Sequence, residues 1–359
     1  YDSSFSIDVN GVWTYEADNA NAAIQSLGVG DTLTEVFTVY SADGTPQNIT
    51  ITINGANDIP VITGTIAQSV IEDSAATLTA SGTLSIIDTD AGESLFLADT
   101  AGSYGNFSVD ANGNWTYAVN NNLPAVQGLG AGDILSEIFV VRSIDNTQIQ
   151  EVTINIVGTN DIPTVVGNIA RTVNEDAAPT LTTSGTLLIS DVDVGESFFV
   201  AQAGSVGTYG TFTINANGNW TYQANNSQAA IQNLGQGDSI TDTFTVYSLD
   251  LSKTQNVTIT IQGTNDGPVA TADSRAMLDT ASPITGNILL NDTDIDSVIT
   301  VSTVNGSSSL TTTGEWGTLS WNADGTYTYT VRPSAASALS AGNTVIEKFN
   351  YVVVDDFGA

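Results

Sequence analysis

The chain contains no cysteine and no histidine among its 359 residues. Without cysteine no disulfide can hold the fold, and thiol chemistry is excluded. Without histidine the commonest general base and the commonest transition-metal ligand are both missing. Basic residues are also scarce, at 6 Lys and Arg against 39 Asp and Glu. Such a surface repels phosphate backbones, so we expect no nucleic acid partner.

Long apolar runs are missing as well. No stretch approaches the ~18 consecutive apolar residues that a membrane-spanning helix requires. The first residues form a polar alternating pattern rather than a signal peptide. We therefore expect no membrane insertion, and we expect any export signal to lie outside these residues.

What the sequence does contain is apolar residues for a core and a large excess of carboxylates. Hydrophobic residues make up 41% of the chain, with 11 Tyr, 11 Phe and 5 Trp, which argues against disorder. The formal net charge is −33. Hard cations with oxygen ligands are the expected partners of so many carboxylates, and a solvated acidic surface that keeps the protein soluble is the alternative.

Two sequence markers recur with one period. Gly-x-Trp-Thr-Tyr occurs at Trp13, Trp115 and Trp220, at spacings of 102 and 105 residues. Gly-x-Asn-Asp-x-Pro ends at Pro60, Pro163 and Pro268, at spacings of 103 and 105 residues. Because proline cannot lie inside a central strand, these prolines mark stiff joints between repeats.

Four repeats follow from these markers. We expect a C-terminal half repeat at 1–58, full repeats at 59–161 and 162–266, and a diverged repeat lacking its last strand at 267–359. Both ends of the sequence then fall inside a repeat.

Within 59–161 the apolar residues alternate, and turn signals come about every ten residues. We expect seven strands, at 61–70, 82–87, 94–98, 104–110, 114–119, 135–142 and 150–157. Asn112-Gly113 predicts a tight hairpin whose flanking Trp115 and Tyr117 face the core. The fold class is therefore all-β, with tandem seven-stranded immunoglobulin- or cadherin-like β-sandwiches in an extended array. Short helical turns are expected only before each Leu-Gly-x-Gly-Asp, as at 21–27 and 228–234.

Strand direction decides where the acidic motifs lie. We call the end where the chain enters a repeat its leading end and the end where the chain leaves it its trailing end. The turn after the first strand and the loop before the 135–142 strand are expected at the trailing end. The loop after the 82–87 strand is expected at the leading end. Three acidic motifs then meet at each joint, and six to eight hard oxygens are what Ca²⁺ prefers, whereas Mg²⁺ demands a tighter octahedron.

The predicted ligands are carboxylates and amides that recur at the same offsets. They are Asp31, Asn57, Asp58, Glu72, Asp73, Asp88, Asp90, Glu93, Asp133, Asn160, Asp161, Glu175, Asp176, Asp191, Asp193, Glu196, Asp238, Asn265, Asp266, Asp292, Asp294 and Asp296. Asp43, Asp145 and Asp250 are weaker candidates. A lone Asp-x-Asp is usually turn chemistry, because Asp caps its own backbone in loops, so turn formers on an acidic surface remain the alternative.

The order of these motifs resembles VCBS repeats, the bacterial cadherin-like modules of giant adhesins. The resemblance covers 59–266 almost fully and 1–58 in part, through Glu-Asp, Ser-Gly-Thr-Leu, Asp-x-Asp-x-Gly-Glu, Asn-Gly-Asn-Trp-Thr-Tyr and Gly-Thr-Asn-Asp-x-Pro. The fourth repeat resembles the related bacterial cadherin-like or tandem-95 type, and Leu278-Asp279 is its nearest match to the Glu-Asp pair. The resemblance implies a secreted protein of the bacterial cell surface, exported by a type I system as part of an RTX adhesin, with roles in adhesion and biofilm.

The leading functional hypothesis is a calcium-stiffened extender that holds a distal binding region away from the cell, with calcium and neighbouring repeats as partners. A self-assembling surface filament or S-layer-like subunit, in which like chains complete one another's sheets, is the second. A glycan-binding module is the third, and Trp316 is the tryptophan that would serve it. No enzyme is expected, because carboxylates that recur in every repeat argue for a structural role.

Overall fold

The computed structural model describes residues 2–97, 102–278, 281 and 283–359. Two predictions concern residues outside this set, namely the Asp279 match to the Glu-Asp pair and the last residue of the 94–98 strand. The chain divides into two compact units, Tyr1–Ile162 with Asp191–Gly195, and Pro163–Ser190 with Glu196–Ala359.

The first unit contains two sets of strands. Residues 2–58 form two antiparallel hairpins, β1 with β2 and β3 with β4. Residues 59–161 form two four-stranded sheets, β5-β7-β10-β9 and β6-β12-β11-β8. The elements are β1 Ser3–Ile7, β2 Trp13–Ala17, α1 Ala22–Gln25, β3 Thr32–Tyr40, β4 Pro46–Asn54, β5 Val61–Gly64, β6 Ala67–Ile71, β7 Thr77–Ile87, β8 Phe96–Leu97, β9 Asn106–Val109, β10 Asn114–Asn120, α2 Pro124–Gln127, β11 Ile134–Ser143 and β12 Ile149–Val157.

The second unit repeats this arrangement and then departs from it. Its first part has a five-stranded sheet, β13-β15-β18-β17-β16, and a three-stranded sheet, β14-β20-β19. Its second part has the sheets β21-β25-β24-β23 and β22-β26. The elements are β13 Thr164–Gly167, β14 Ala170–Asn174, β15 Thr180–Ser190, β16 Gln202–Val206, β17 Gly210–Ile214, β18 Asn219–Asn225, α3 Ala229–Gln232, β19 Ser239–Tyr247, β20 Thr254–Gln262, β21 Ile284–Asn287, β22 Thr300–Val304, β23 Thr311–Thr313, β24 Gly317–Trp321, β25 Thr326–Val331, α4 Pro333–Ala336 and β26 Tyr351–Val354.

The sandwich prediction is confirmed, with three differences in the strands. The expected 61–70 strand is two strands, because Gly64 at φ 125° turns the chain from one sheet to the other. As a result β5 pairs antiparallel with β7, and β6 pairs parallel with β12. The 82–87 strand is longer than expected and begins at Thr77, and repeat three has an additional strand, β16. The helical turns before each Leu-Gly-x-Gly-Asp are confirmed as α1, α2 and α3.

The core of repeat two lies between its sheets, around Trp115. The Trp115 indole nitrogen donates a hydrogen bond to the carbonyl oxygen of Thr65 (3.0 Å), and Phe107 stacks on Phe139 with ring centroids 4.5 Å apart. Gly82 faces the Trp115 ring, because a Cβ atom on Gly82 would lie 2.5 Å from that ring. Repeat three has an equivalent core around Trp220. Trp13, the equivalent tryptophan of the half repeat, is 44% exposed.

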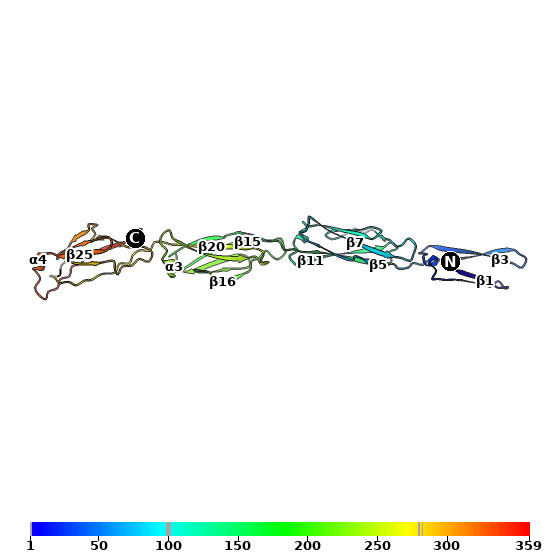
Figure 1. Ribbon diagram of the computed structural model, residues 1–359, viewed down its shortest axis with the longest axis horizontal. Coiled ribbons are helices and arrows are strands. Elements are labelled where there is room, and N and C mark those ends of the chain that lie inside the picture. The colour runs from blue at the N-terminus through cyan, green and yellow to red at the C-terminus, as the bar shows by residue number, and fades with distance from the viewer. Residues whose placement is uncertain (1, 98–101, 279–280, 282) are drawn as a thin grey trace. The chain divides into compact units, whose positions relative to one another are not determined.

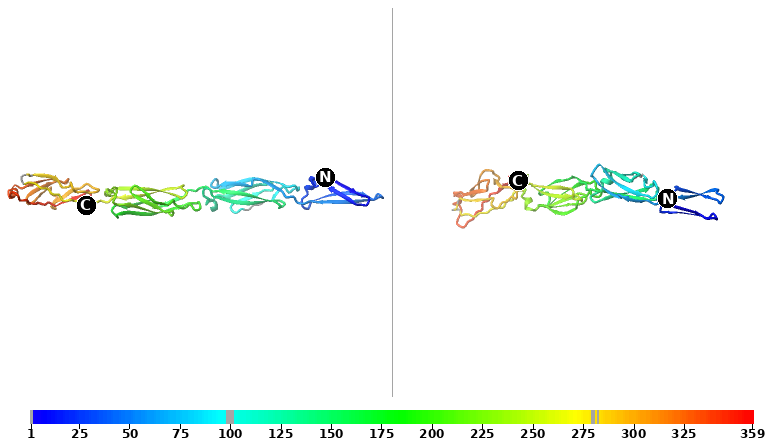
Figure 2. Two further views of the ribbon diagram at one scale, coloured as in Figure 1. Left: turned by 90° about the horizontal axis from the view of Figure 1, so that it is seen from below. Right: turned by 45° about the vertical axis from the view of Figure 1, so that its right-hand side comes forward.

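The strands of each repeat run along its length, so that the loops gather at its two ends (Figures 1 and 2). In Figure 1 the labels β5 and β7 mark repeat two, and β15 and β20 mark repeat three. The short helices α2 and α3 lie in the loops that follow β10 and β18. Across the described ranges, the helices are too short to cross a bilayer.

Candidate metal sites at the joints

Each joint is a linker together with the acidic loops around it. In the first joint the linker is residues 55–60, and the loop 88–93 follows β7. The Asp90 amide donates to Asp88 Oδ1 (3.0 Å), which folds the loop back on itself, and the Asp58 amide donates to Asp90 Oδ2 (2.8 Å). The second and third linkers make the same contact, from Asp161 to Asp193 Oδ2 (2.9 Å) and from Asp266 to Asp296 Oδ2 (3.1 Å). The linker is thereby attached to the loop that carries the predicted ligands.

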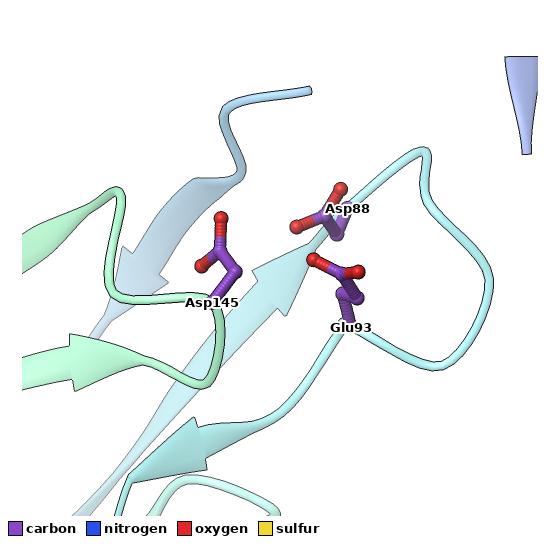
Figure 3. Close-up of side chains that lie close together, drawn as sticks. All are labelled: Asp88, Glu93 and Asp145. Carbon is purple, nitrogen blue, oxygen red and sulfur yellow. The ribbon is translucent and has the colours of Figure 1, made fainter. Parts of the chain in front are cut away.

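Three carboxylates meet at the leading end of repeat two. Asp88, Glu93 and Asp145 each place one oxygen so that all three oxygens lie within 4.8 Å of one another. Figure 3 shows Asp88 and Glu93 on the two sides of one loop, facing Asp145 on the loop between β11 and β12. Asn57 of the linker donates to Asp145 Oδ2 (3.2 Å). Asp145 was only a weaker candidate from the sequence, and the structure places it in the cluster.

The trailing end of repeat one contacts the same loop. The Ala91 amide donates to the carbonyl oxygen of Ser26 (3.1 Å). A Cβ atom on Gly28 would lie 2.7 Å from Glu93 Oε1, so any larger residue there would require this carboxylate to shift. Burial raises the pKa of Glu93, and the charges of Asp90, Asp88, Asp145 and Asp31 raise it further. Asp31 of repeat one therefore belongs to the electrostatic surroundings of this cluster.

The second joint gathers residues from the trailing end of repeat two. Glu72 is 1% exposed, and its Oε2 accepts a hydrogen bond from the Thr159 amide (3.0 Å). Burial raises the pKa of Glu72, and the charges of Asp73, Asp161 and Asp193 add to the effect. The pKa of Asp161 is raised for the same reason, burial first and its acidic neighbours second.

The third joint shows the same concentration of charge. Glu175, Asp176 and Asp266 place oxygens within 4.8 Å of one another. Burial raises the pKa of Glu175 to about 7, with further contributions from the charges of Asp176, Asp266 and Asp296. The Asn265 amide group donates to Asp355 Oδ2 (2.6 Å).

Buried oxygens without a hydrogen-bond partner test whether these residues fit a cation. At the joints these atoms include Asp88 Oδ2, Asp90 Oδ1, Glu93 Oε2, Asp161 Oδ2, Glu175 Oε2, Asn265 Oδ1, Asp266 Oδ2, Asp294 Oδ2 and Asp296 Oδ1. Leaving a buried carboxylate oxygen unsatisfied is costly, and like charges at this distance repel. A set made only of carboxylate and amide oxygens fits a hard divalent cation such as Ca²⁺ or Mg²⁺.

The fourth repeat carries three alternating acids in the equivalent loop. The Asp296 amide donates to Asp294 Oδ1 (3.1 Å), as the Asp90 amide does to Asp88, so Asp294 and Asp296 stand where Asp88 and Asp90 stand in repeat two. Asp292 is buried, and its Oδ1 accepts a hydrogen bond from the Thr271 amide (2.6 Å).

Several predicted ligands lie at the joints without joining a carboxylate cluster. The side chains of Asp31, Asp133 and Asp238 are exposed, and their carbonyl oxygens accept hydrogen bonds from Gly55, Gly158 and Gly263 (2.9–3.0 Å). Asn160 is exposed and donates to the carbonyl oxygen of Asp161 (2.7 Å). Asp43 is exposed.

Two groups of acidic residues were missed from the sequence. Asp355, which binds Asn265, stands at the same repeat offset as Asp145 and Asp250, and this spacing could have identified it. The second group lies inside the repeats. Glu137 Oε1 accepts hydrogen bonds from the amides of Ser103 (2.7 Å) and Tyr104 (2.8 Å), and Oε2 accepts them from Gly105 N (3.0 Å) and Tyr117 Oη (2.5 Å).

Asp242 makes the equivalent contacts in repeat three. It accepts hydrogen bonds from the amides of Thr208, Tyr209 and Gly210 and from Tyr222 Oη (2.8 Å). Burial raises the pKa of both tyrosines, and their hydrogen bonds to the carboxylates raise it further, so both hydroxyls stay protonated donors. Glu137 and Asp242 are 105 residues apart, as are Trp115 and Trp220, so the repeat period carried this signal too.

Comparison with known proteins gives one family. A family model described as the bacterial cadherin-like domain matches residues 57–158, 160–263 and 265–359. A comparison with curated protein sequences finds no significant match.

Three solved structures illustrate what the fold is similar to. Cadherin domains 3–6 of protocadherin gamma B2 are 14% identical over 98% of this chain and 85% of that one, with a TM-score of 0.39. A Ca²⁺-stabilized adhesin that helps an Antarctic bacterium bind ice is 18% identical over 98% and 89%, with a TM-score of 0.26. Drosophila N-cadherin EC1–4 is 13% identical over 98% and 91%, with a TM-score of 0.31. At these identities and TM-scores, the family model alone carries the assignment.

Proposed function

Because the chain belongs to the bacterial cadherin-like domain family, we propose that it is a calcium-stiffened extender region of a large bacterial cell-surface adhesin. In this role the repeats hold a distal binding region away from the cell. Calcium at the joints couples each repeat to the next, so that a string of small sandwiches resists bending.

The buried joint oxygens without partners carry this proposal. In the first joint they belong to Asp88, Asp90 and Glu93, and the Asp90 carboxylate also holds the linker through the Asp58 amide. A cation bound here would satisfy these oxygens and oppose the repulsion among them. It would also fix the linker to the loop, because Asp90 takes part in both interactions. Removal of the cation would leave like charges facing one another at each joint.

The wider setting follows from the family and the resemblance to VCBS repeats. We propose a location outside the cell, after type I secretion as part of an RTX adhesin. We propose no enzymatic activity for this region, because the acidic groups recur at every joint and the repeated tryptophans Trp115 and Trp220 are core residues. Trp316 is half-buried beside Arg332, whose amide donates to the Trp316 carbonyl oxygen (3.0 Å). This contact is made by the backbone of Trp316, so it assigns no role to the indole and does not favour a glycan site.

Small-angle scattering of the full chain tests the stiffening. With calcium we expect a larger maximum dimension and a persistently extended profile. With EDTA we expect a smaller radius of gyration and a broader distribution of shapes. Magnesium at the same concentration is the control, and it should not restore the calcium profile. Identical profiles in calcium and in EDTA would overturn the proposal.

A further inference from the structure

Amide side chains hold the Glu-Asp pair at the trailing end of repeat two. Gln127, the last residue of α2, donates from Nε2 to Asp73 Oδ1 (2.8 Å) and to Glu72 Oε1 (3.4 Å). Asn121 follows β10, and its Nδ2 donates to the same Asp73 oxygen (2.7 Å) while its Oδ1 accepts from the Asp73 amide (3.0 Å). Two neutral amides thus fix both carboxylates.

The same arrangement recurs in repeat three. Gln232, the last residue of α3, donates to Glu175 Oε1 (3.2 Å) and to Asp176 Oδ1 (3.1 Å). Asn226 donates to Asp176 Oδ1 (2.8 Å) and accepts from the Asp176 amide (3.4 Å). Four contacts are therefore reproduced in a second repeat whose surrounding sequence differs.

The fourth repeat lacks both partners together. Its helix α4 ends at Ala336, where α2 and α3 end in glutamine. The sequence of 267–359 also contains no Glu-Asp dipeptide. In repeats two, three and four the glutamine is thus present where the acidic pair is present and missing where the pair is missing. The half repeat also ends its helix in glutamine, at Gln25, and residues 1–58 contain no Glu-Asp dipeptide.

The choice of an amide has a physical reason. Two adjacent carboxylates repel, and Asp73 and Asp176 adopt left-handed backbone angles (φ 58° and 57°) that cost energy in a residue other than glycine. A lysine or arginine would offset the repulsion but would compete with a cation for the same oxygens. Glutamine donates to Oε1 of each glutamate, whereas Oε2 accepts from the Thr159 amide in Glu72 and is buried without a partner in Glu175.

We propose that Gln127 with Asn121, and Gln232 with Asn226, are positioning residues that hold each Glu-Asp pair in the geometry that binds the joint cation. The proposal rests on calcium being the cation, as argued above. Residues that orient metal ligands typically change metal affinity by about 10–100-fold when they are removed.

Calcium titration calorimetry of the 359-residue chain tests the proposal, with Gln127→Met and Gln232→Met as single variants. Methionine keeps the length of the side chain and removes its donors. We expect each variant to weaken one class of calcium sites at least tenfold and the double variant to weaken two. Gln25→Met is the matched control and should leave calcium affinity unchanged, because no Glu-Asp pair in this chain faces it.

Hydrogen exchange in EDTA separates positioning from a purely structural role. Positioning residues should leave the exchange of β10 and β12 amides close to wild type in EDTA and reduce the added protection that calcium gives. Unchanged calcium affinity together with faster exchange in EDTA would overturn the proposal and assign the amides to folding alone. If the wild-type chain binds no calcium, the extender function fails as well, so the two failures are distinct.

Discussion

The interior of repeat two and the joint at its leading end both bury a carboxylate, and the surroundings of the two differ. Glu137 lies in the sandwich at 6% exposure and accepts hydrogen bonds from three backbone amides and from Tyr117. Asp90 lies in the joint loop at 2% exposure, and its Oδ1 has no partner. The two groups are buried to a similar degree and differ in how fully their oxygens are hydrogen-bonded.

This difference separates two functions of acidic residues in one chain. A buried carboxylate with several donors is complete within its own repeat and ties a loop to a strand. A buried carboxylate with an unsatisfied oxygen, surrounded by further carboxylates, is stable only with a positive charge nearby. Burial alone would assign both to the core, and the hydrogen-bond partners distinguish them. Calcium should therefore act on the joint group and leave the interior group unaffected.

The largest effect is expected from Glu137→Ala. The substitution leaves three amides and the Tyr117 hydroxyl without their acceptor, which should lower the stability of repeat two by about 3 kcal/mol. Denaturation followed by the fluorescence of Trp115, with hydrogen exchange to resolve the repeats, measures the loss. Because Glu137 is not a cation ligand, the loss should be equal in calcium and in EDTA. Tyr117→Phe is the control and should cost about 1 kcal/mol. A loss seen only in calcium would contradict the comparison.

The effect of Asp90→Asn on the stability of repeat two should instead change sign when calcium is added. In EDTA the variant removes one charge from a crowded cluster, so repeat two should be slightly more stable than wild type. In calcium the wild type should gain about 2.7 kcal/mol at a concentration a hundred times its dissociation constant, and the variant should gain less. Hydrogen exchange of the peptides that cover β7 and β8 in both buffers measures this. If the variant is less stable than wild type in both buffers, Asp90 has the structural role of Glu137 and is not a cation ligand.

Repetition made most of the fold predictable from sequence. The Trp115 and Trp220 motifs recur with one period, and alternation around Asn112-Gly113 fixes which side chains face the core. The split of the first strand was missed, because Gly64 and the parallel pairing of β6 with β12 leave no alternating pattern of their own. Parallel pairing joins segments about 86 residues apart, such as Ala67 and Thr153, and such long-range contacts leave little local signal.

The sequence indicated where the candidate site lies better than it indicated which acidic residues belong to it. Repeated acidic offsets indicated the joints and the loops that form them. The register of Asp292, Asp294 and Asp296 was left open by the sequence, because three alternating acids allow two alignments with Asp88 and Asp90, and the hydrogen bond between Asp294 and Asp296 selects one. Glu137 was passed over because a single acidic residue in an alternating strand reads as a solvated side chain. Its burial depends on Tyr117 and on a loop more than 30 residues away.

The pH dependence at Glu175 gives a smaller effect with a defined sign. Its pKa is about 7 in the folded chain, against 4.5 for an ordinary glutamate. The folded state therefore binds more protons between about pH 4.5 and 7, so in EDTA stability should be highest below this range and fall as the pH rises through it. In calcium the trend should reverse, because protons compete with the cation. Thermal unfolding of wild type and Glu175→Gln at pH 5 and pH 7.5 measures the pH dependence of stability in EDTA and in calcium. If stability changes equally with pH in the two proteins, Glu175 is not the cause.

The smallest effect is expected at Asp43, which occupies in repeat one the loop position that Asp145 occupies in repeat two. Asp43 is exposed, and its carboxylate accepts hydrogen bonds from the Ser41 hydroxyl and the Thr45 amide of its own turn. Asp145 faces Asp88 and Glu93 and accepts from Asn57 of the linker. Calorimetry should therefore show weaker calcium binding for Asp145→Asn and none of this change for Asp43→Asn. Equal losses would mean that an exposed turn carboxylate can bind the cation without a cluster, and the distinction between turn chemistry and joint chemistry would no longer hold.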